Sequence, residues 1–176
     1  MALVEIFTPT GVVAGVSARP GLVQSPDLRS PVPVERARWY PHDGSKPERR
    51  GSVLVPPDDV LLVAIPEVEL TIHAAWYLLV LEIGPYRVRG RFPTPPGFDP
   101  ARALARPGGA FVALRDGTIE LMHRPEAGIA ERASIHVSRY AVESVESTLM
   151  LGYYFPGARQ KSHATEPGPA IEAPVA

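Results

Sequence analysis

The sequence predicts a mainly β protein with two tandem small β-barrels, one short helix in each, and a disordered C-terminal tail. Three observations carry this prediction. Apolar residues make up 45% of the 176 residues, which is enough to build a core. Proline is frequent, with 21 residues, and proline interrupts helices and central strands, so short strands and many turns are expected. Finally, segments of the first half correspond to segments of the second half.

The correspondence is clearest where each half ends. The segments RGSVLVPPDDVLLVAIPE (50–67) and RASIHVSRYAVESVES (132–147) match without a gap, and the starting segments 2–16 and 78–92 also correspond, with Gly15 at the position of Gly90. From these correspondences we predict an internal duplication with a pseudo-two-fold relation, and such a repeat would determine the fold. The alternative is that the matches arise by chance in an apolar-rich chain. The matched pairs share one offset: Arg50–Arg132, Ser52–Ser134, Val53–Ile135, Val55–Val137, Val60–Val142 and Val63–Val145.

The predicted division of the chain follows from these matches. Unit 1 spans residues 1–67 and unit 2 spans residues 78–147, with an apolar connector at 68–77 that is too apolar for a free linker. An apolar and aromatic extension follows at 148–157. Residues 158–176 are polar and proline-rich without periodicity, which predicts a disordered tail.

Unit 2 begins with two alternating strands. Residues 79–83 alternate between the two faces of a strand, and Gly84-Pro85 marks a turn. In the returning strand 86–92, Val88, Gly90 and Phe92 share one face, which leaves the arginines between them on the other face.

The remainder of unit 2 contains the helix and the closing strands. In FDPARALARPGG, Asp99 is placed to cap a short helix and Gly108-Gly109 to end it. We predict a strand at 110–114, a hairpin turn at Asp116-Gly117 and a returning strand at 118–123. A loop at 124–132 and strands at 134–137 and 141–145 complete the unit. Unit 1 shows the same order, with its helix position at 22–30.

This order of strands resembles that of small SH3-like barrels. Unit 2 resembles an uncharacterised bacterial family of this kind, related in outline to Sm-like domains. The resemblance is carried by LVLEIGPYRVRGRF (79–92), GFDPARAL (97–104), GAFVALRDGTIEL (109–121) and SIHVSRYAVESV (134–145). Sm-like domains commonly place an asparagine and an arginine in the closing turn. This chain has Ser138 and Arg139 in unit 2 and Pro56 and Pro57 in unit 1, so the resemblance supports the fold and hardly RNA binding.

One strand is a candidate nucleic-acid surface. Arg87, Arg89 and Arg91 place three guanidinium groups about 7 Å apart on one strand face, close to the phosphate repeat of an extended single strand. Tyr86 or Phe92 could offer stacking surface, and Arg139 is a further cationic candidate. The alternative is a solvated face whose arginines pair with Glu82, Glu120 or Glu143.

The aromatic extension is a candidate protein-docking segment. Its apolar side chains would either contact a partner or a second copy, or form a final strand that covers a barrel edge or the seam between units. The candidate docking residues are Leu149, Leu151, Tyr153, Tyr154 and Phe155.

No constellation predicts catalysis, a metal or a cofactor. Ser134 and His136 share a strand face, yet no orienting carboxylate or G-x-S-x-G turn accompanies them. The five histidines form no i, i+4 pair, and the chain has no cysteine, which excludes disulfides and thiolate ligands. The catalytic, metal and cofactor-binding residue sets are therefore predicted to be empty.

Charge and hydropathy limit the classes of partner and the location that are expected. With 18 Lys+Arg against 19 Asp+Glu, the formal charge is −1, which gives no electrostatic reason to expect a nucleic-acid or membrane partner. The longest apolar run, 74–81, is far shorter than the roughly 20 residues of a membrane span, and no signal peptide is evident, so a cytoplasmic protein is expected.

The predicted function is a non-catalytic binding or scaffold module acting through protein–protein interaction or self-assembly. Binding of RNA or single strands through Arg87, Arg89 and Arg91 is the alternative.

Overall fold

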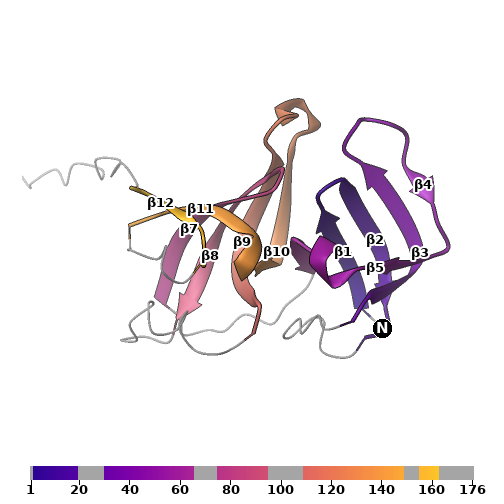
Figure 1. Cartoon of the computed structure of the whole chain (residues 1–176), viewed down its shortest axis with the longest axis horizontal. Helices are drawn as coiled ribbons and strands as arrows, with labels where there is room; N and C mark the ends of the chain where they lie inside the picture. Colours follow the sequence, from indigo (N-terminus) through magenta and orange to yellow (C-terminus); the bar gives the residue numbers. More distant parts are fainter. Residues whose placement is uncertain (1, 20–29, 66–74, 95–108, 149–154, 163–176) are drawn as a thin grey trace, which may run out of the picture.

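Strands dominate the fold (Figure 1). The computed structural model describes residues 2–19, 30–65, 75–94, 109–148 and 155–162. Three 3-10 turns are η1 (Pro57–Asp59), η2 (Pro125–Ala127) and η3 (Arg139–Ala141). The strands are β1 (Ala2–Thr8), β2 (Gly11–Ser17), β3 (Val32–Pro41), β4 (Glu48–Arg49), β5 (Ser52–Val55), β6 (Leu62–Ile65), β7 (Ala75–Ile83), β8 (Tyr86–Thr94), β9 (Phe111–Leu121), β10 (Ile129–Ser138), β11 (Val142–Ser147) and β12 (Arg159–Ser162).

The strands form one open sheet, so the prediction of two small closed barrels is wrong. The strand order is β12-β11-β7-β8-β9-β10-β6-β1-β2-β3-β4, and β5 also pairs with β3. The predicted helices are not seen either: the described residues contain 3-10 turns but no longer helix, and segments 22–30 and 97–104 lie outside them except for Ser30. Within the described residues, no helix is long and apolar enough to cross a membrane.

Strand β6 is the reason that the halves join. It pairs with β1 through Ile6↔Val63 and with β10 through His136↔Val63, so it lies in the middle of the sheet. Its four residues, LVAI, are all apolar and all buried. A strand at the surface of a small barrel would alternate inward and outward residues. Because β6 is apolar on both faces, both faces need cover, and the second half of the chain supplies the missing one.

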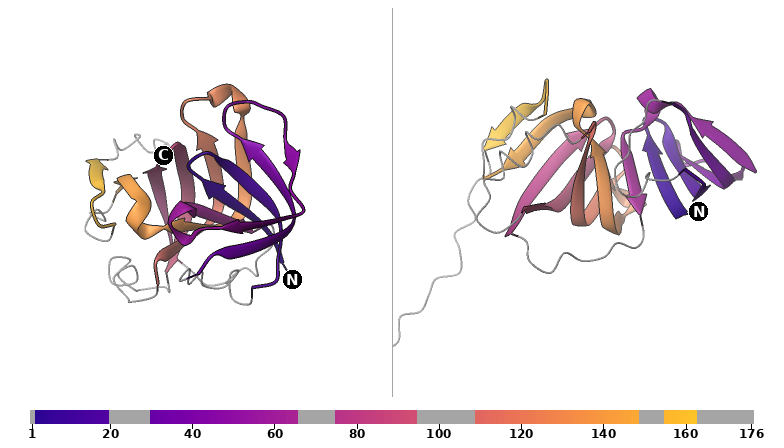
Figure 2. Two further views of the ribbon diagram at one scale, coloured as in Figure 1. Left: turned by 45° about the vertical axis from the view of Figure 1, so that its right-hand side comes forward. Right: turned by 90° about the horizontal axis from the view of Figure 1, so that it is seen from below.

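Two hydrophobic cores lie on opposite faces of β6. Leu62 and Ala64 belong to the core formed with β7–β11, whereas Val63 and Ile65 belong to the core formed with β1–β3 and β5. Figure 2 shows the two parts of the bent sheet side by side from two further directions. One continuous sheet thus encloses a core on each side of its central strand.

Both halves follow the same strand order. In the second half β7, β8, β9 and β10 pair in sequence, and β11 returns to β7 after η3. In the first half β1, β2, β3 and β5 pair in sequence, and β6 returns to β1 after η1. The turns η1 and η3 are separated by the same offset as Arg50 and Arg132. The internal duplication itself stays a prediction.

The predicted hairpin at Asp116-Gly117 is a β-bulge inside the single strand β9. Arg89 pairs with Thr118 and Arg91 with Arg115, so two residues of β9 face Gly90 alone. Asp116 takes a positive φ of 46°, as the inserted residue of such a bulge can. In the first half the register shifts likewise opposite Gly15, where Arg36 has a φ of 51°.

The described part of the predicted tail is ordered by pairing. Residues 159–162 form β12, which runs parallel to β11 from Ser144↔Arg159 to Ser147↔Ser162. Lys161 Nζ lies 2.7 Å from a carboxylate oxygen of Glu82, which fixes the strand against β7. The disordered tail predicted to begin at residue 158 therefore needs correction over this segment, because a polar four-residue strand lacks the apolar pattern that marks a strand in sequence.

Candidate functional site

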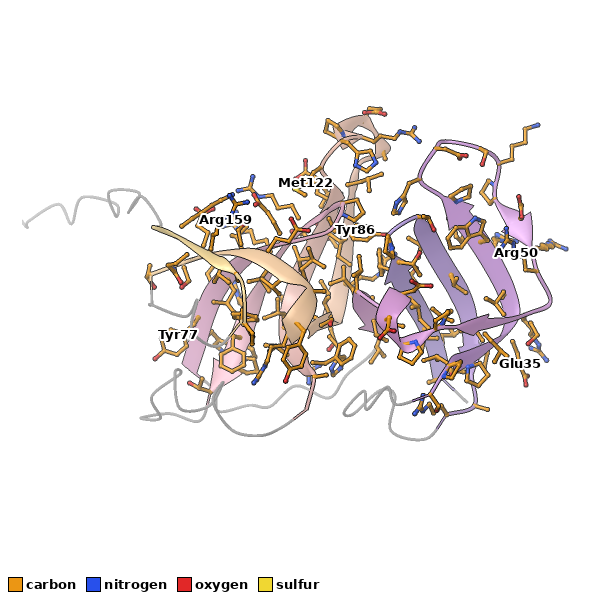
Figure 3. All side chains as sticks on the ribbon, viewed as in Figure 1. Glu35, Arg50, Tyr77, Tyr86, Met122 and Arg159 are labelled. Atoms are coloured by element: carbon orange, nitrogen blue, oxygen red, sulfur yellow. The ribbon has the colours of Figure 1, made fainter. Side chains whose placement is uncertain are left out.

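The arginine strand has the predicted alternation. In β8 the side chains of Arg87, Arg89 and Arg91 are exposed, while Val88, Gly90 and Phe92 between them are buried. The period-2 pattern of the sequence is thus confirmed for this strand. Figure 3 shows the side chains of this half of the sheet and labels Tyr86, the first residue of β8.

Carboxylates surround this arginine face. A guanidinium nitrogen of Arg87 lies 3.5 Å from Glu146, and one of Arg91 lies 3.9 Å from Asp116. Two further carboxylates, Glu82 and Glu120, stand directly opposite Arg87 in the sheet register. Arg89 has no ion pair within the described ranges. Because these four carboxylates lie around three guanidinium groups, the face has little net attraction for a polyanion.

The predicted stacking residues are not available at this face. Tyr86 is 2% exposed and Phe92 is 8% exposed, and both side chains belong to the core. Arg139 lies in η3, a different element, where it is half-buried and its backbone N–H donates to the carbonyl of Ala110. The structure thus keeps three arginines together without the aromatic surface expected beside them.

The predicted docking segment is described only at its end. Phe155 is fully buried in the core of the second half, so it is not a free docking residue, which corrects the prediction. The prediction for Leu149, Leu151, Tyr153 and Tyr154 lies outside the described residues.

The Ser134 and His136 side chains share the face that was expected, but both are buried. No hydrogen bond between them is found, and the flanking residues Ile135 and Val137 belong to the core. Within the ranges that the structure describes, no three His, Asp or Glu residues come together in a group that could hold a metal ion.

Sequence reasoning missed a cavity of about 520 Å³ at the junction of the two halves. Phe7 and Val12 line it from the first half, and Ile119 and Leu121 line it from β9. Its polar lining includes two arginines of the β9–β10 hairpin, Arg124 and Arg132, with His42 and Tyr86. These residues come from segments far apart in sequence, so no local pattern could have predicted the site.

The charged groups of this junction cavity already have partners. Arg132 binds both carboxylate oxygens of Glu5, with its Nη2 at 2.9 Å, and the hydrogen bond raises the pKa of Arg132 further above its usual range. Arg124 binds Glu126 at 2.9 Å and donates to the carbonyl of His42 at 3.0 Å. The junction cavity therefore has ion pairs that hold its walls together rather than free charges for a ligand.

Tyr86 and His42 form the polar centre of the junction (Figure 3 labels Tyr86). The Tyr86 hydroxyl donates to the carbonyl of Thr8 at 2.8 Å, and its oxygen lies 2.7 Å from His42 Nε2. Since the hydroxyl has one proton, His42 Nε2–H donates to Tyr86, and Nδ1 carries the lone pair. Burial raises the pKa of Tyr86 far above its usual range and lowers the pKa of His42.

A second feature missed in the sequence is the outer side of β5. β5 pairs with β3 on one side, and within the described part of the chain no strand pairs with its other side. Leu54 lies opposite Pro33, which has no N–H, so this pair cannot be a hydrogen-bonded one. The alternation of antiparallel pairs then makes Val53 and Val55 bond to β3 and turns the N–H and C=O of Leu54 outward.

The side chain of Leu54 adds an apolar surface beside these outward backbone groups. It is 66% exposed, one of the largest values among the hydrophobic residues. A hollow of about 230 Å³ beside β5 is lined by Val13, Trp39, Val53 and Val55 among others. The other end of the sheet, β12, carries the polar residues RQKS instead. We refer to the outward side of residues 52–55 as the β5 edge.

Comparison with known proteins finds no matching family model, no matching curated protein and no matching solved structure. The resemblance to SH3-like and Sm-like domains therefore stays a prediction. Function has to be inferred from the geometry of the β5 edge, the arginine face and the junction cavity.

Proposed function

We propose that this chain is a non-catalytic binding module that acts through protein–protein contacts at the β5 edge. The observation that supports the proposal is the outward N–H and C=O of Leu54 together with its 66% exposed side chain. An unpaired strand edge is a template for another strand, because backbone hydrogen bonds supply affinity and side-chain pockets supply specificity. The class of partner is a protein segment in extended conformation.

The test uses a labelled peptide with the sequence of residues 50–57, RGSVLVPP, and a scrambled peptide as control. We expect saturable binding of the first peptide in fluorescence anisotropy. Leu54→Pro should abolish it, because proline removes the outward N–H without removing a bond to β3. Leu54→Lys, which keeps the backbone donor but places a charge at the edge, should weaken it. Equal binding of both peptides, or unchanged binding in both variants, would refute the proposal.

Nucleic-acid binding through β8 is a second candidate function, supported by the exposed guanidinium of Arg89, which has no ion pair among the described residues, between Arg87 and Arg91. It requires that phosphates displace the contacts of Arg87 with Glu146 and of Arg91 with Asp116. The test is anisotropy with short labelled RNA and single-stranded DNA at low and physiological salt. Binding that weakens with salt and is lost when the three arginines become alanine would support it, and no binding at low salt would exclude it.

A further inference from the structure

The β5 edge belongs to a longer ribbon along β3. Strand β4 pairs with β3 at Trp39↔Glu48, and β5 pairs with β3 from Glu35↔Ser52 onward. Between them the backbone of Ala37 bonds to Arg50 at 2.8 Å and to Gly51 at 3.1 Å. Residues 48–55 therefore follow one side of β3 continuously, with a bend at Gly51, whose φ is 39°.

Opposite charges flank β5. Glu48, Arg49 and Arg50 precede it with a net charge of +1, and Asp58 and Asp59 follow it in η1 with a net charge of −2. All five residues are exposed. Arg50 is paired with Glu48 at 2.9 Å and stacks on Trp39, whereas Arg49 has no ion pair in the parts of the chain that are described.

These charges favour one orientation of a second copy. We propose that the β5 edge pairs with the β5 edge of another molecule of this chain, antiparallel and around a two-fold axis; this proposal rests on the proposed function. Antiparallel pairing places the basic end of each strand beside the acidic end of the other. Parallel pairing would place like charges together, which is unfavourable.

The hydrogen-bond pattern of the edge fits a two-fold axis. Ser52 and Leu54 share the outward orientation, since they are two residues apart on β5. With the axis at Val53, Ser52 of each copy exchanges hydrogen bonds with Leu54 of the other, which gives about four interchain bonds. The interface is isologous: each copy contributes the same surface.

The side chains are also accommodated in this arrangement. The two exposed Leu54 side chains become diagonal neighbours on the outer face, where each loses contact with water. The side chain of Val53 from the second copy points to the inner face, beside the hollow lined by Trp39 and Val55. Because β5 has only four residues, the pair is a weak, concentration-dependent dimer rather than an obligate one.

The first test is sedimentation velocity of the full chain over a series of concentrations up to about 0.5 mM, where a dimer of this weak class is populated. We expect reversible dimerisation that Leu54→Pro and Leu54→Lys abolish. Arg49→Glu and Asp58→Lys should each weaken the dimer roughly tenfold, because every contact occurs twice, and the double variant should restore it. Failure of the double variant to restore the dimer would refute the antiparallel orientation.

The second test determines the register. The chain has no cysteine, so Ser52→Cys and Leu54→Cys introduce single thiols. Oxidation of an equimolar mixture should give the mixed disulfide, because opposite residues lie about 5.5 Å apart between Cα atoms. A mixture of Leu54→Cys with Met122→Cys, whose residue is also exposed, is the control and should give none. Equal cross-linking in both mixtures would refute the register.

The outcomes separate this inference from the proposed function. A chain that stays monomeric at the highest concentration but binds the residue 50–57 peptide would exclude the second copy and retain the edge as a docking site. A chain that does neither would exclude both.

Discussion

The hydroxyl of Tyr86 provides a sharp test of how the two halves are joined. In Tyr86→Phe the ring still fills its site, which is 2% exposed, but the carbonyl of Thr8 loses the hydroxyl donor and His42 Nε2–H loses the hydroxyl acceptor. A buried polar group left without a partner costs about 1–3 kcal/mol, and because the carbonyl and the ring are affected together we expect a loss of about 2 kcal/mol. For a chain of this size the melting temperature should fall by roughly 4–8 °C.

The assay is urea unfolding followed by tryptophan fluorescence, with Tyr140→Phe as the matched control. Tyr140 is 67% exposed, so removal of its hydroxyl should change the free energy of unfolding by less than about 0.5 kcal/mol. If Tyr86→Phe were as stable as the control, the Tyr86–His42 contact would contribute nothing to joining the halves, and the reasoning would be refuted.

Three further predictions follow from buried and half-buried positions. Gly90→Ala should lower the free energy of unfolding by about 1–3 kcal/mol, because the added methyl carbon would lie 2.9 Å from Cβ of Leu114. Gly128→Ala is the comparison: an added methyl carbon there has no atom within 4 Å, so this variant tests the strain of a φ of 85° without a steric clash. Phe155→Ala should cost about 3–5 kcal/mol in thermal unfolding, and a loss below about 1 kcal/mol would contradict its burial in the core. Partial burial lowers the pKa of His42 below its usual value of 6.5. The unfolded chain therefore binds this proton at a higher pH than the folded chain, and stability should fall as the pH drops below 6.5. His42→Gln should reduce that slope, and an unchanged slope would contradict the assignment.

The alternation of β8 could be predicted because it depends on the two-residue period of a strand alone. Gly90 between Arg89 and Arg91 reads as an inward position in the sequence, and it is buried in the structure. The strand order within each half could also be anticipated from the turns and short apolar runs. These features are local, so the sequence contains the information directly.

The sharing of β6 could not be predicted from local pattern. An apolar run such as LVAI indicates burial but does not say which elements cover each face. β1 and β10 pair with the two edges of β6, and a separate core covers each of its faces. Both arrangements depend on contacts between distant segments. The closed barrels were therefore the wrong conclusion from a correct observation.

The Asp116-Gly117 pair was misread for a related reason. The same two residues can form a hairpin turn or a bulge, since each of these motifs needs a residue with a positive φ, and Asp116 has one of 46°. Which one forms is decided by the neighbouring strands, because β8 pairs with β9 from Arg115 to Leu121 and β10 pairs with it from Phe111 to Glu120, so both strands continue past these two residues. The Tyr86–His42 contact likewise joins residues that only the assembled sheet brings together.

The outward backbone groups of the β5 edge could not be predicted from the sequence alone. Pro33 in β3 removes a donor, and the pairing with Leu54 then decides which backbone groups of β5 point outward. The pairing itself has to be known from the structure, so the proline alone gave no signal.

The most direct test of the account is a dilution series of amide NMR spectra of the full chain. Self-pairing at the β5 edge predicts concentration-dependent shifts of the amides of Ser52 and Leu54, while those of Arg87 and Arg91 stay constant. Leu54→Lys should remove the dependence. Shifts confined to β8, or none at any concentration, would contradict the central claim that the β5 edge is where a second copy binds.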